Sequence, residues 1–177
     1  MENVNIKIGT RKMVIAGMLG AVTIVLGATG LGFIPIPNLA GRATIMHIPV
    51  ILAAILEGPV VGAFTGFIFG LYSFLTPTGA IPADPIVRIL PRILIGVFSY
   101  YAFWAFRWNT TLASAIAAAV GTLTNTIGFL GLAVLIGYFP LEMAYVIIIN
   151  NTIFEVLLAI VITVALVRAL KKYREKF

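Results

Sequence analysis

The residues of this sequence that are best suited to chemistry lie in or beside long apolar stretches. Arg88 and Arg92 are four residues apart, so they share one face of the helix that the surrounding residues predict. A guanidinium group in a dry cavity binds a carboxylate or phosphate through paired hydrogen bonds. Asp84 precedes Arg88 by four residues and is placed to pair with it. We expect Arg92 to be the main anion ligand, with Arg42 and Arg88 as candidate partners. Alternatively, Arg88 extends toward lipid headgroups, because it is closer to the preceding loop.

Amide and carboxyl side chains in the last two apolar stretches form a second candidate group. Asn125 lies near the middle of one stretch, and Asn151 and Glu155 are four residues apart in the next. Polar groups inside a membrane are costly, and their default interpretation is functional. Alternatively, Asn151 and Glu155 only hydrogen-bond to neighbouring helices and hold a bundle together. The sequence leaves both interpretations open.

A third group lies around the first loop and at the end of the third apolar stretch. Its candidate ligands are Asn38, Arg42, Thr44, His47 and Tyr72. His47 is the sole histidine, and without a second histidine or a cysteine it is a poor metal ligand. Packing explains it slightly better than contact with a ligand, whereas Tyr72 is placed to stack on a bound molecule. We expect no metal site and no cofactor.

Composition decides what kind of protein carries these residues. Of the 177 residues, 61% are hydrophobic and 10% are charged, cysteine is absent, and the mean hydropathy is +1.11. A soluble domain is about half apolar and about a quarter charged, so most of this surface is expected to face lipid. The sequence has no P-loop, HExxH or GxSxG motif. We therefore expect neither a soluble protein nor an enzyme.

Apolar stretches separated by Gly, Pro and charged residues predict an all-α integral membrane protein with six transmembrane helices in one bundle. A spanning helix needs about 20 apolar residues, so the second and third are expected to tilt or to pack against the others. No linker or repeat divides the chain, and residues 1–177 are expected to form one domain. The predicted helices cover approximately residues 13–34, 42–56, 60–75, 86–106, 112–136 and 141–170.

Positive charge predicts the orientation. With six spans both termini lie on one side, and nine of the twelve basic residues fall there, which marks that side as the cytoplasm. This rule explains the net charge of +6, so we expect no nucleic-acid partner. Arg42, Arg88 and Arg92 are exceptions on the outer side. Since the rule gives no reason for them, they indicate a binding site near the outer face.

Small residues at four-residue spacing predict close contacts between helices. The third helix carries such a strip, which we expect to pack inside the bundle rather than in a dimer interface: Gly58, Gly62, Gly66 and Gly70. The first helix carries two overlapping pairs near its cytoplasmic end: Ala16 with Gly20, and Gly17 with Ala21. These pairs either pack internally or form a docking strip for another membrane protein.

Two runs of sequence carry a resemblance to a known family. Residues 43–75, ATIMHIPVILAAILEGPVVGAFTGFIFGLYSFL, and residues 91–96, PRILIG, resemble the substrate-binding S component of an energy-coupling factor (ECF) vitamin transporter. The resemblance covers essentially the whole chain. It implies a multi-pass protein of the prokaryotic plasma membrane that binds a water-soluble vitamin near the outer face. It also implies that a transmembrane coupling subunit docks on the small residues of the first helix, while two cytoplasmic ATPases use the ATP.

The resemblance is greatest to members that take up pantothenate, whose carboxylate, hydroxyls and amide suit arginine, asparagine and threonine side chains. Folate is the second candidate, and riboflavin, niacin, pyridoxine and hydroxymethylpyrimidine remain open. We expect few aromatic residues in the pocket, which argues against a large ring. Two other classes of protein fit the sequence less well: a solitary facilitator or channel would need a continuous polar path, and a structural membrane protein would leave Arg92, Asn151 and Glu155 unexplained.

Overall fold

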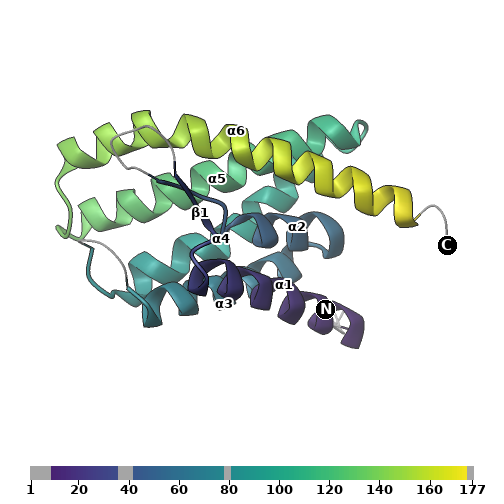
Figure 1. Cartoon of the computed structure of the whole chain (residues 1–177), viewed down its shortest axis with the longest axis horizontal. Helices are drawn as coiled ribbons and strands as arrows, with labels where there is room; N and C mark the ends of the chain where they lie inside the picture. Colours follow the sequence, from purple (N-terminus) through teal and green to yellow (C-terminus); the bar gives the residue numbers. More distant parts are fainter. Residues whose placement is uncertain (1–8, 36–41, 78–80, 175–177) are drawn as a thin grey trace, which may run out of the picture.

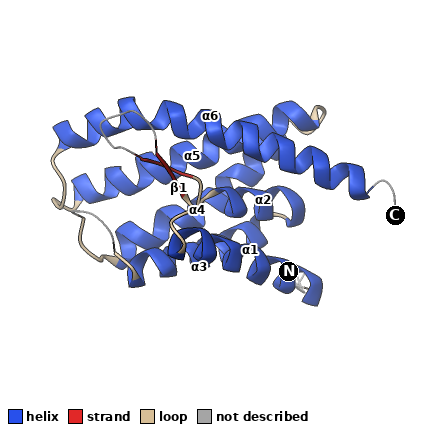
Figure 2. Cartoon of the chain, viewed as in Figure 1, coloured by secondary structure: helices blue, strands red, loops and turns tan. Residues whose placement is uncertain are grey.

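The structure is a computed structural model that describes residues 9–35, 42–77 and 81–174, with the backbone alone described at Arg42 and at residues 171–174. Six helices and one short hairpin make up this part of the chain (Figure 1, Figure 2). Their bounds are α1 (Thr10–Ala28), β1 (Phe33–Pro35), β2 (Arg42–Thr44), α2 (Ile48–Glu57), α3 (Pro59–Leu75), α4 (Pro85–Ala105), α5 (Thr110–Leu135) and α6 (Leu141–Arg174).

Local chemistry explains where several helices begin and end. Asp84 caps α4 and Asn109 caps α5, since each side chain accepts hydrogen bonds from two backbone N–H groups of the first turn. Gly58 separates α2 from α3 with φ at +103°, a conformation that other residues rarely adopt. Pro59 then begins α3. Proline suits this position because its ring fixes φ near the helical value, and because an N–H group in the first turn of a helix would have no intrahelical acceptor.

Two of the predicted helix ranges are wrong around the first loop. The helix predicted at 13–34 stops at Ala28, and the one predicted at 42–56 begins only at Ile48. The residues left over form β1 and β2, which pair antiparallel. This pairing joins two segments that residues 36–41 separate in the sequence, so neither segment predicts it alone. The other four predicted ranges match the observed helices closely.

The short helix α2 lies at the centre of the bundle. It contacts each of the five other helices, and residues 48–54 are all buried. Around it, α1 packs on α2 and α3, while α3, α4, α5 and α6 pack in chain order. With ten residues α2 is too short to span a bilayer. Protein rather than lipid therefore covers its apolar surface.

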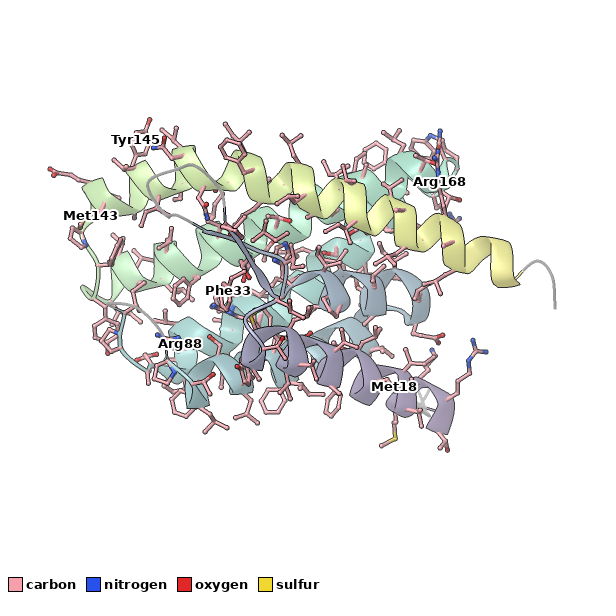
Figure 3. The ribbon with its side chains drawn as sticks, viewed as in Figure 1. Met18, Phe33, Arg88, Met143, Tyr145 and Arg168 are labelled. Atoms are coloured by element: carbon pink, nitrogen blue, oxygen red, sulfur yellow. The ribbon has the colours of Figure 1, made fainter. Side chains whose placement is uncertain are left out.

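Four helices are long and apolar enough to cross a membrane: α1, α4, α5 and residues 141–170 of α6. Large apolar side chains cover the outside of the bundle, and Figure 3 shows Met18 and Tyr145 pointing away from it. The beginning of α1 and the end of α6 lie at the same end of the molecule (Figure 1). An apolar exterior over hydrogen-bonded helices is what lipid requires.

The glycine strip of α3 packs against α4. A Cβ atom on three of these glycines would meet the backbone of α4: Gly62, Gly66 and Gly70. Gly96 of α4 approaches α3 in the same way, so the two backbones touch without side chains between them. Gly58 does not belong to this strip, because it lies in the break between two helices with no atom within 4 Å of its Cβ position.

The two small-residue pairs of α1 face different ways. Ala16 and Gly20 are buried, and a Cβ atom on Gly20 would collide with Ile68 of α3. Gly17 and Ala21 are exposed. The expectation of a single four-residue docking strip is therefore wrong. Neighbouring residues on a helix point about 100° apart, so one pair packs internally and the other is left for an outside partner.

Candidate binding site

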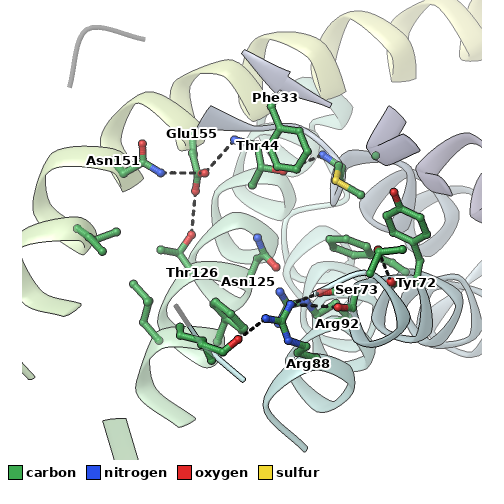
Figure 4. Close-up of a pocket in the computed structure, with 18 of the residues that line it drawn as sticks. Phe33, Thr44, Tyr72, Ser73, Arg88, Arg92, Asn125, Thr126, Asn151 and Glu155 are labelled. Atoms are coloured by element: carbon green, nitrogen blue, oxygen red, sulfur yellow. Dashed lines mark hydrogen bonds between the residues drawn. The ribbon is translucent and has the colours of Figure 1, made fainter. Parts of the chain in front are cut away.

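A cavity of about 460 Å³ lies among α3, α4, α5 and α6, with the β1–β2 hairpin contributing to its wall (Figure 4). Seven of the predicted site residues line it: Thr44, Tyr72, Arg88, Arg92, Asn125, Asn151 and Glu155. They come from one strand and four helices. Only the folded chain brings them together.

Arg92 supplies a buried cation to the cavity wall. It is 6% exposed, and its guanidinium carbon lies 4.4 Å from the ring centre of Phe129 and 5.5 Å from that of Phe69. Its Nη1 donates to the Val87 carbonyl at 3.1 Å. Pro91 has no N–H for that carbonyl, so the Arg92 side chain replaces the missing helix donor. Within the described residues the Arg92 Nε has no hydrogen-bond partner, and a bound anion would supply one.

Arg88 is also buried, but its guanidinium has a structural task. It donates to the backbone carbonyls of Ser73, Ile81 and Pro82. These bonds tie the end of α3 to the segment that leads into α4 (Figure 4). The alternative in which Arg88 extends toward lipid headgroups is wrong, because it is only 2% exposed among these carbonyls. Arg88 also lines the cavity, as a candidate ligand should.

Asp84 does not line the cavity, and among the described residues it forms no ion pair with Arg88. Its Oδ1 accepts from the N–H groups of Ile86 and Val87 at 2.8 and 3.1 Å, and its Oδ2 accepts from the Tyr138 hydroxyl at 3.2 Å. The hydrogen bond from Tyr138 to Asp84 raises the pKa of the Tyr138 phenol. Asp84 thus caps α4 and joins two loops, in place of the predicted role as a ligand.

Glu155 belongs to a buried polar cluster on a different side of the cavity from the arginines (Figure 4). Its Oε1 accepts from the Thr44 N–H and from the Asn151 Nδ2, both at 3.0 Å, and its Oε2 accepts from the Thr126 hydroxyl at 2.9 Å. These bonds join β2, α5 and α6 through one carboxyl group. Asn151 and Glu155 therefore hold neighbouring elements together and also face the cavity.

The remaining predicted ligands lie in different surroundings. Asn125 is buried on the cavity wall, and its Oδ1 has no hydrogen-bond partner in the part of the chain that the structure describes. His47 does not line the cavity; its Nε2 lies 2.8 Å from the Thr122 Oγ1 in the core between α2 and α5, so packing accounts for it. Asn38 and the side chain of Arg42 lie outside the described residues.

Aromatic side chains form a large part of the cavity wall, and of these only Tyr72 was predicted from the sequence. Five of them line the cavity: Phe33, Phe69, Tyr72, Phe129 and Phe139. The expectation of few aromatic residues is therefore wrong. Helical spacing offers a signal for two of them, since Phe129 follows Asn125 by four residues and Phe69 precedes Tyr72 by three. Thr126 was also missed, although it directly follows Asn125.

The arrangement is suited to binding a small polar molecule. A buried cation, an amide and a carboxyl group project from a largely aromatic and aliphatic wall, which is the usual composition of a ligand pocket. The described ranges contain no group of three His, Cys, Asp or Glu side chains that could hold a metal ion. The strongest single preference of this wall is for an anionic group beside Arg92.

Residues 11–171 match the family described as ECF transporter, substrate-specific component, and the chain belongs to that family. Its relatives include the pantothenic acid transporter PanT of Lactococcus lactis subsp. cremoris, which is 32% identical over 75% of this chain and 80% of the relative. The pantothenate transporter PanT of Leuconostoc mesenteroides subsp. mesenteroides is 30% identical over 82% of this chain and 84% of the relative.

Two solved structures share the fold. One is described as the S component of a bacterial ECF transporter, with a TM-score of 0.65, 23% identity, and coverage of 92% of this chain and 96% of that chain. The other is ThiT from Listeria monocytogenes, with a TM-score of 0.68, 21% identity, and coverage of 91% and 95%. The chain thus has the fold of an ECF S component.

Proposed function

We propose that this chain is the substrate-capture subunit of an ECF-type importer and that its ligand is pantothenate. The observation that carries the proposal is Arg92, a buried cation on the wall of a cavity of about 460 Å³. Two relatives that are 30–32% identical are named for pantothenate, and this supports the choice of ligand.

The groups along the cavity suit the parts of pantothenate in turn. Among the described residues the Nε of Arg92 has no hydrogen-bond partner, and it would bind the ligand carboxylate, with Phe69 and Phe129 holding the guanidinium in position. The Oδ1 of Asn125 has no partner in this part of the chain either, and it would accept a hydrogen bond from the amide N–H of the ligand. The apolar part of the wall would cover the two methyl groups of the pantoyl end.

Folate is a second candidate, because five aromatic side chains in the wall offer faces on which its ring system would stack. A facilitator or channel is less well supported. It would need a polar path beyond the cavity, and α2, which lies at the centre of the bundle, has an almost wholly apolar sequence.

We further propose that the chain crosses the plasma membrane several times, with both termini in the cytoplasm and the cavity near the outer face. The start of α1 and the end of α6 lie at the same end of the molecule. The predicted topology assigns nine of the twelve basic residues to the side on which both termini lie, which favours a cytoplasmic location for that side. The hairpin and the segment before α4 contribute residues to the cavity wall. That segment lies at the opposite end of the molecule from the start of α1 and the end of α6 (Figure 1).

The partners of this subunit would be a transmembrane coupling subunit and two cytoplasmic ATPases. The chain has no P-loop, so ATP hydrolysis would belong to the partners. The exposed small residues Gly17 and Ala21 of α1 offer a flat surface on which a helix of the coupling subunit would dock.

The test is ligand identification on the detergent-purified chain without nucleotide. Released small molecules are identified by mass spectrometry after denaturation, and pantothenate, folate, riboflavin, niacin and pyridoxine are then titrated by calorimetry. We expect saturable binding of pantothenate with one site per chain. Binding of folate in its place would support the second candidate. Binding of none of these vitamins would contradict the assignment of pantothenate and would favour an untested ligand, and after that a structural role.

A further inference from the structure

We propose that Glu155 is a specificity-determining residue: it binds the hydroxyl groups at the end of the ligand remote from Arg92 and excludes ligands that carry a second carboxylate there. This inference rests on the proposed function, because it assumes that pantothenate occupies the cavity. It states which end of pantothenate faces Arg92 and which faces Glu155, and it explains why a ligand with two carboxylates would be excluded.

The carboxylate of Glu155 can accept one hydrogen bond more than the three that it receives from the protein. A carboxylate has about four acceptor positions, and three are filled by the Thr44 N–H, the Asn151 amide and the Thr126 hydroxyl. All three donors are neutral. Within the described residues no ion pair includes Glu155, although it is only 3% exposed. A donor from a ligand in the cavity would fill the fourth position.

The position of Glu155 relative to Arg92 sets the direction of the ligand. Arg92 projects from α4 and Glu155 from α6, while Asn125 projects from α5, which packs on both of these helices. Figure 4 shows Asn125 between the arginines and Glu155. Pantothenate has a carboxylate at one end, an amide in the middle and hydroxyls at the other end. With its carboxylate on Arg92, it presents its hydroxyls to Glu155.

Glu155 would also reject wrong ligands. The charged side chains that line the cavity in the described part of the chain are Arg88, Arg92 and Glu155. Arg88 is held by three backbone carbonyls beside Arg92, on the other side of Asn125 from Glu155, so it is not placed to pair with a second ligand anion at Glu155 (Figure 4). A like charge brought against a buried carboxylate is strongly unfavourable. A ligand with carboxylates at both ends would therefore bind poorly.

The experiment compares four compounds on the detergent-purified chain by calorimetry. They are pantothenate, its analogue with the terminal CH2OH replaced by CH3, its analogue with that group replaced by a carboxylate, and panthenol, in which the original carboxylate is replaced by CH2OH. For the unmodified chain we expect the CH3 analogue to bind about tenfold more weakly than pantothenate. We expect the dicarboxylate to bind more than about a hundredfold more weakly.

Two variants then assign each preference to a side chain. Glu155→Gln should bring the affinities of pantothenate and the dicarboxylate to within about a few-fold of each other, because the repulsion is removed. The preference for pantothenate over panthenol should persist in this variant. Arg92→Gln should show the reverse pattern, with the preference over panthenol lost and the preference over the CH3 analogue retained. Thermal melting of each variant reports whether it folds.

The hypothesis that Glu155 has only a structural role predicts a different result. Glu155→Gln would then weaken every compound by the same factor and leave the affinity ratios unchanged, which would overturn the inference. Equal binding of pantothenate and the dicarboxylate by the unmodified chain would overturn it without any variant. In both cases pantothenate still binds and the proposed function stands. Absence of pantothenate binding would instead overturn the proposed function, and this assignment with it.

Discussion

At the scale of single residues, Arg88 and Arg92 take different tasks although they share one helical face. Arg88 is surrounded by backbone carbonyls at the end of α3 and before α4, and it holds these segments together. Arg92 lies one turn deeper against two phenylalanine rings, and its Nε has no hydrogen-bond partner among the described residues. A buried donor without a partner costs about 1–3 kcal/mol, so an anion that accepted a hydrogen bond from this Nε would gain a comparable stabilisation.

Substitution should separate the two arginines. Arg92→Gln is expected to weaken pantothenate binding by about tenfold to a hundredfold, because a charge-assisted hydrogen bond contributes about 1.5–3 kcal/mol. The variant should still fold, since an amide can donate to the Val87 carbonyl in its place. Calorimetry measures the first effect and thermal melting the second.

Arg88→Gln is the matched control for this prediction. We expect it to lower the melting temperature more than Arg92→Gln does, because several buried carbonyls lose their donor. If Arg92→Gln left the affinity unchanged, Arg92 would not be the anion ligand.

At the scale of the elements, the contact between α3 and α4 positions the cation. Three glycines of α3 and Gly96 of α4 allow the two backbones to touch. A Cβ atom on Gly66 would collide with the carbonyl of Arg92 itself. The close approach of α3 and α4 therefore determines how far Arg92 projects into the cavity. This approach requires glycine at the positions where the two backbones touch.

Gly66→Ala should destabilise the protein and weaken ligand binding together. The added methyl group meets backbone rather than a movable side chain, and overpacking of this kind costs about 1–3 kcal/mol. Gly131→Ala in α5 is the matched control, because nothing lies within 4 Å of its Cβ position and helical Gly→Ala changes are neutral or stabilising by up to about 1 kcal/mol. Thermal melting of both variants in detergent is the measurement. Equal melting temperatures of the two variants would contradict the prediction, because they would show that α4 can move away from α3 without loss of stability.

At the scale of the whole molecule, the exterior is divided between lipid and a coupling partner. Most exposed side chains on the membrane-length helices are large and apolar, as lipid contact requires. On α1, the exposed residues Gly17 and Ala21 leave a narrow flat strip between large exposed side chains such as Met18. Close approach of another transmembrane helix needs such a surface, since packing in lipid depends on van der Waals contact.

Gly17→Leu is expected to leave pantothenate binding by the isolated subunit unchanged and to stop uptake by the assembled transporter. The leucine side chain would prevent close docking without touching the cavity, because nothing lies within 4 Å of the Cβ position. Gly131→Leu places the same side chain on α5 and should retain uptake. Binding is measured in detergent, and uptake in proteoliposomes that contain the coupling subunit and both ATPases. Normal uptake by Gly17→Leu would contradict the docking role.

Gly20→Leu is expected to behave differently from Gly17→Leu. Its side chain would collide with Ile68 inside the bundle and so lower the melting temperature of the isolated subunit. The two neighbouring positions on α1 thus distinguish docking from folding.

Much of the fold was predictable because its causes are local. Long apolar stretches predict helices in lipid, and breakers such as Gly58, Pro59 and the Asp84 cap lie at the observed boundaries. Buried polar residues were also identified, because an arginine or glutamate within an apolar stretch avoids lipid and turns toward protein. Glu155 was identified on this ground, and Arg92 was identified as an exception to the positive-inside rule.

The tertiary structure decided which partners these residues have. The hydrogen bond from Thr44 to Glu155 joins residues 111 positions apart, and no local pattern predicts it. The same is true of the hairpin between β1 and β2, and of the choice between the two faces of α1. Hydropathy and helical period determine that a side chain turns inward, since they depend on a few neighbours in sequence. What it meets there depends on how distant segments pack, and that is a property of the whole folded chain.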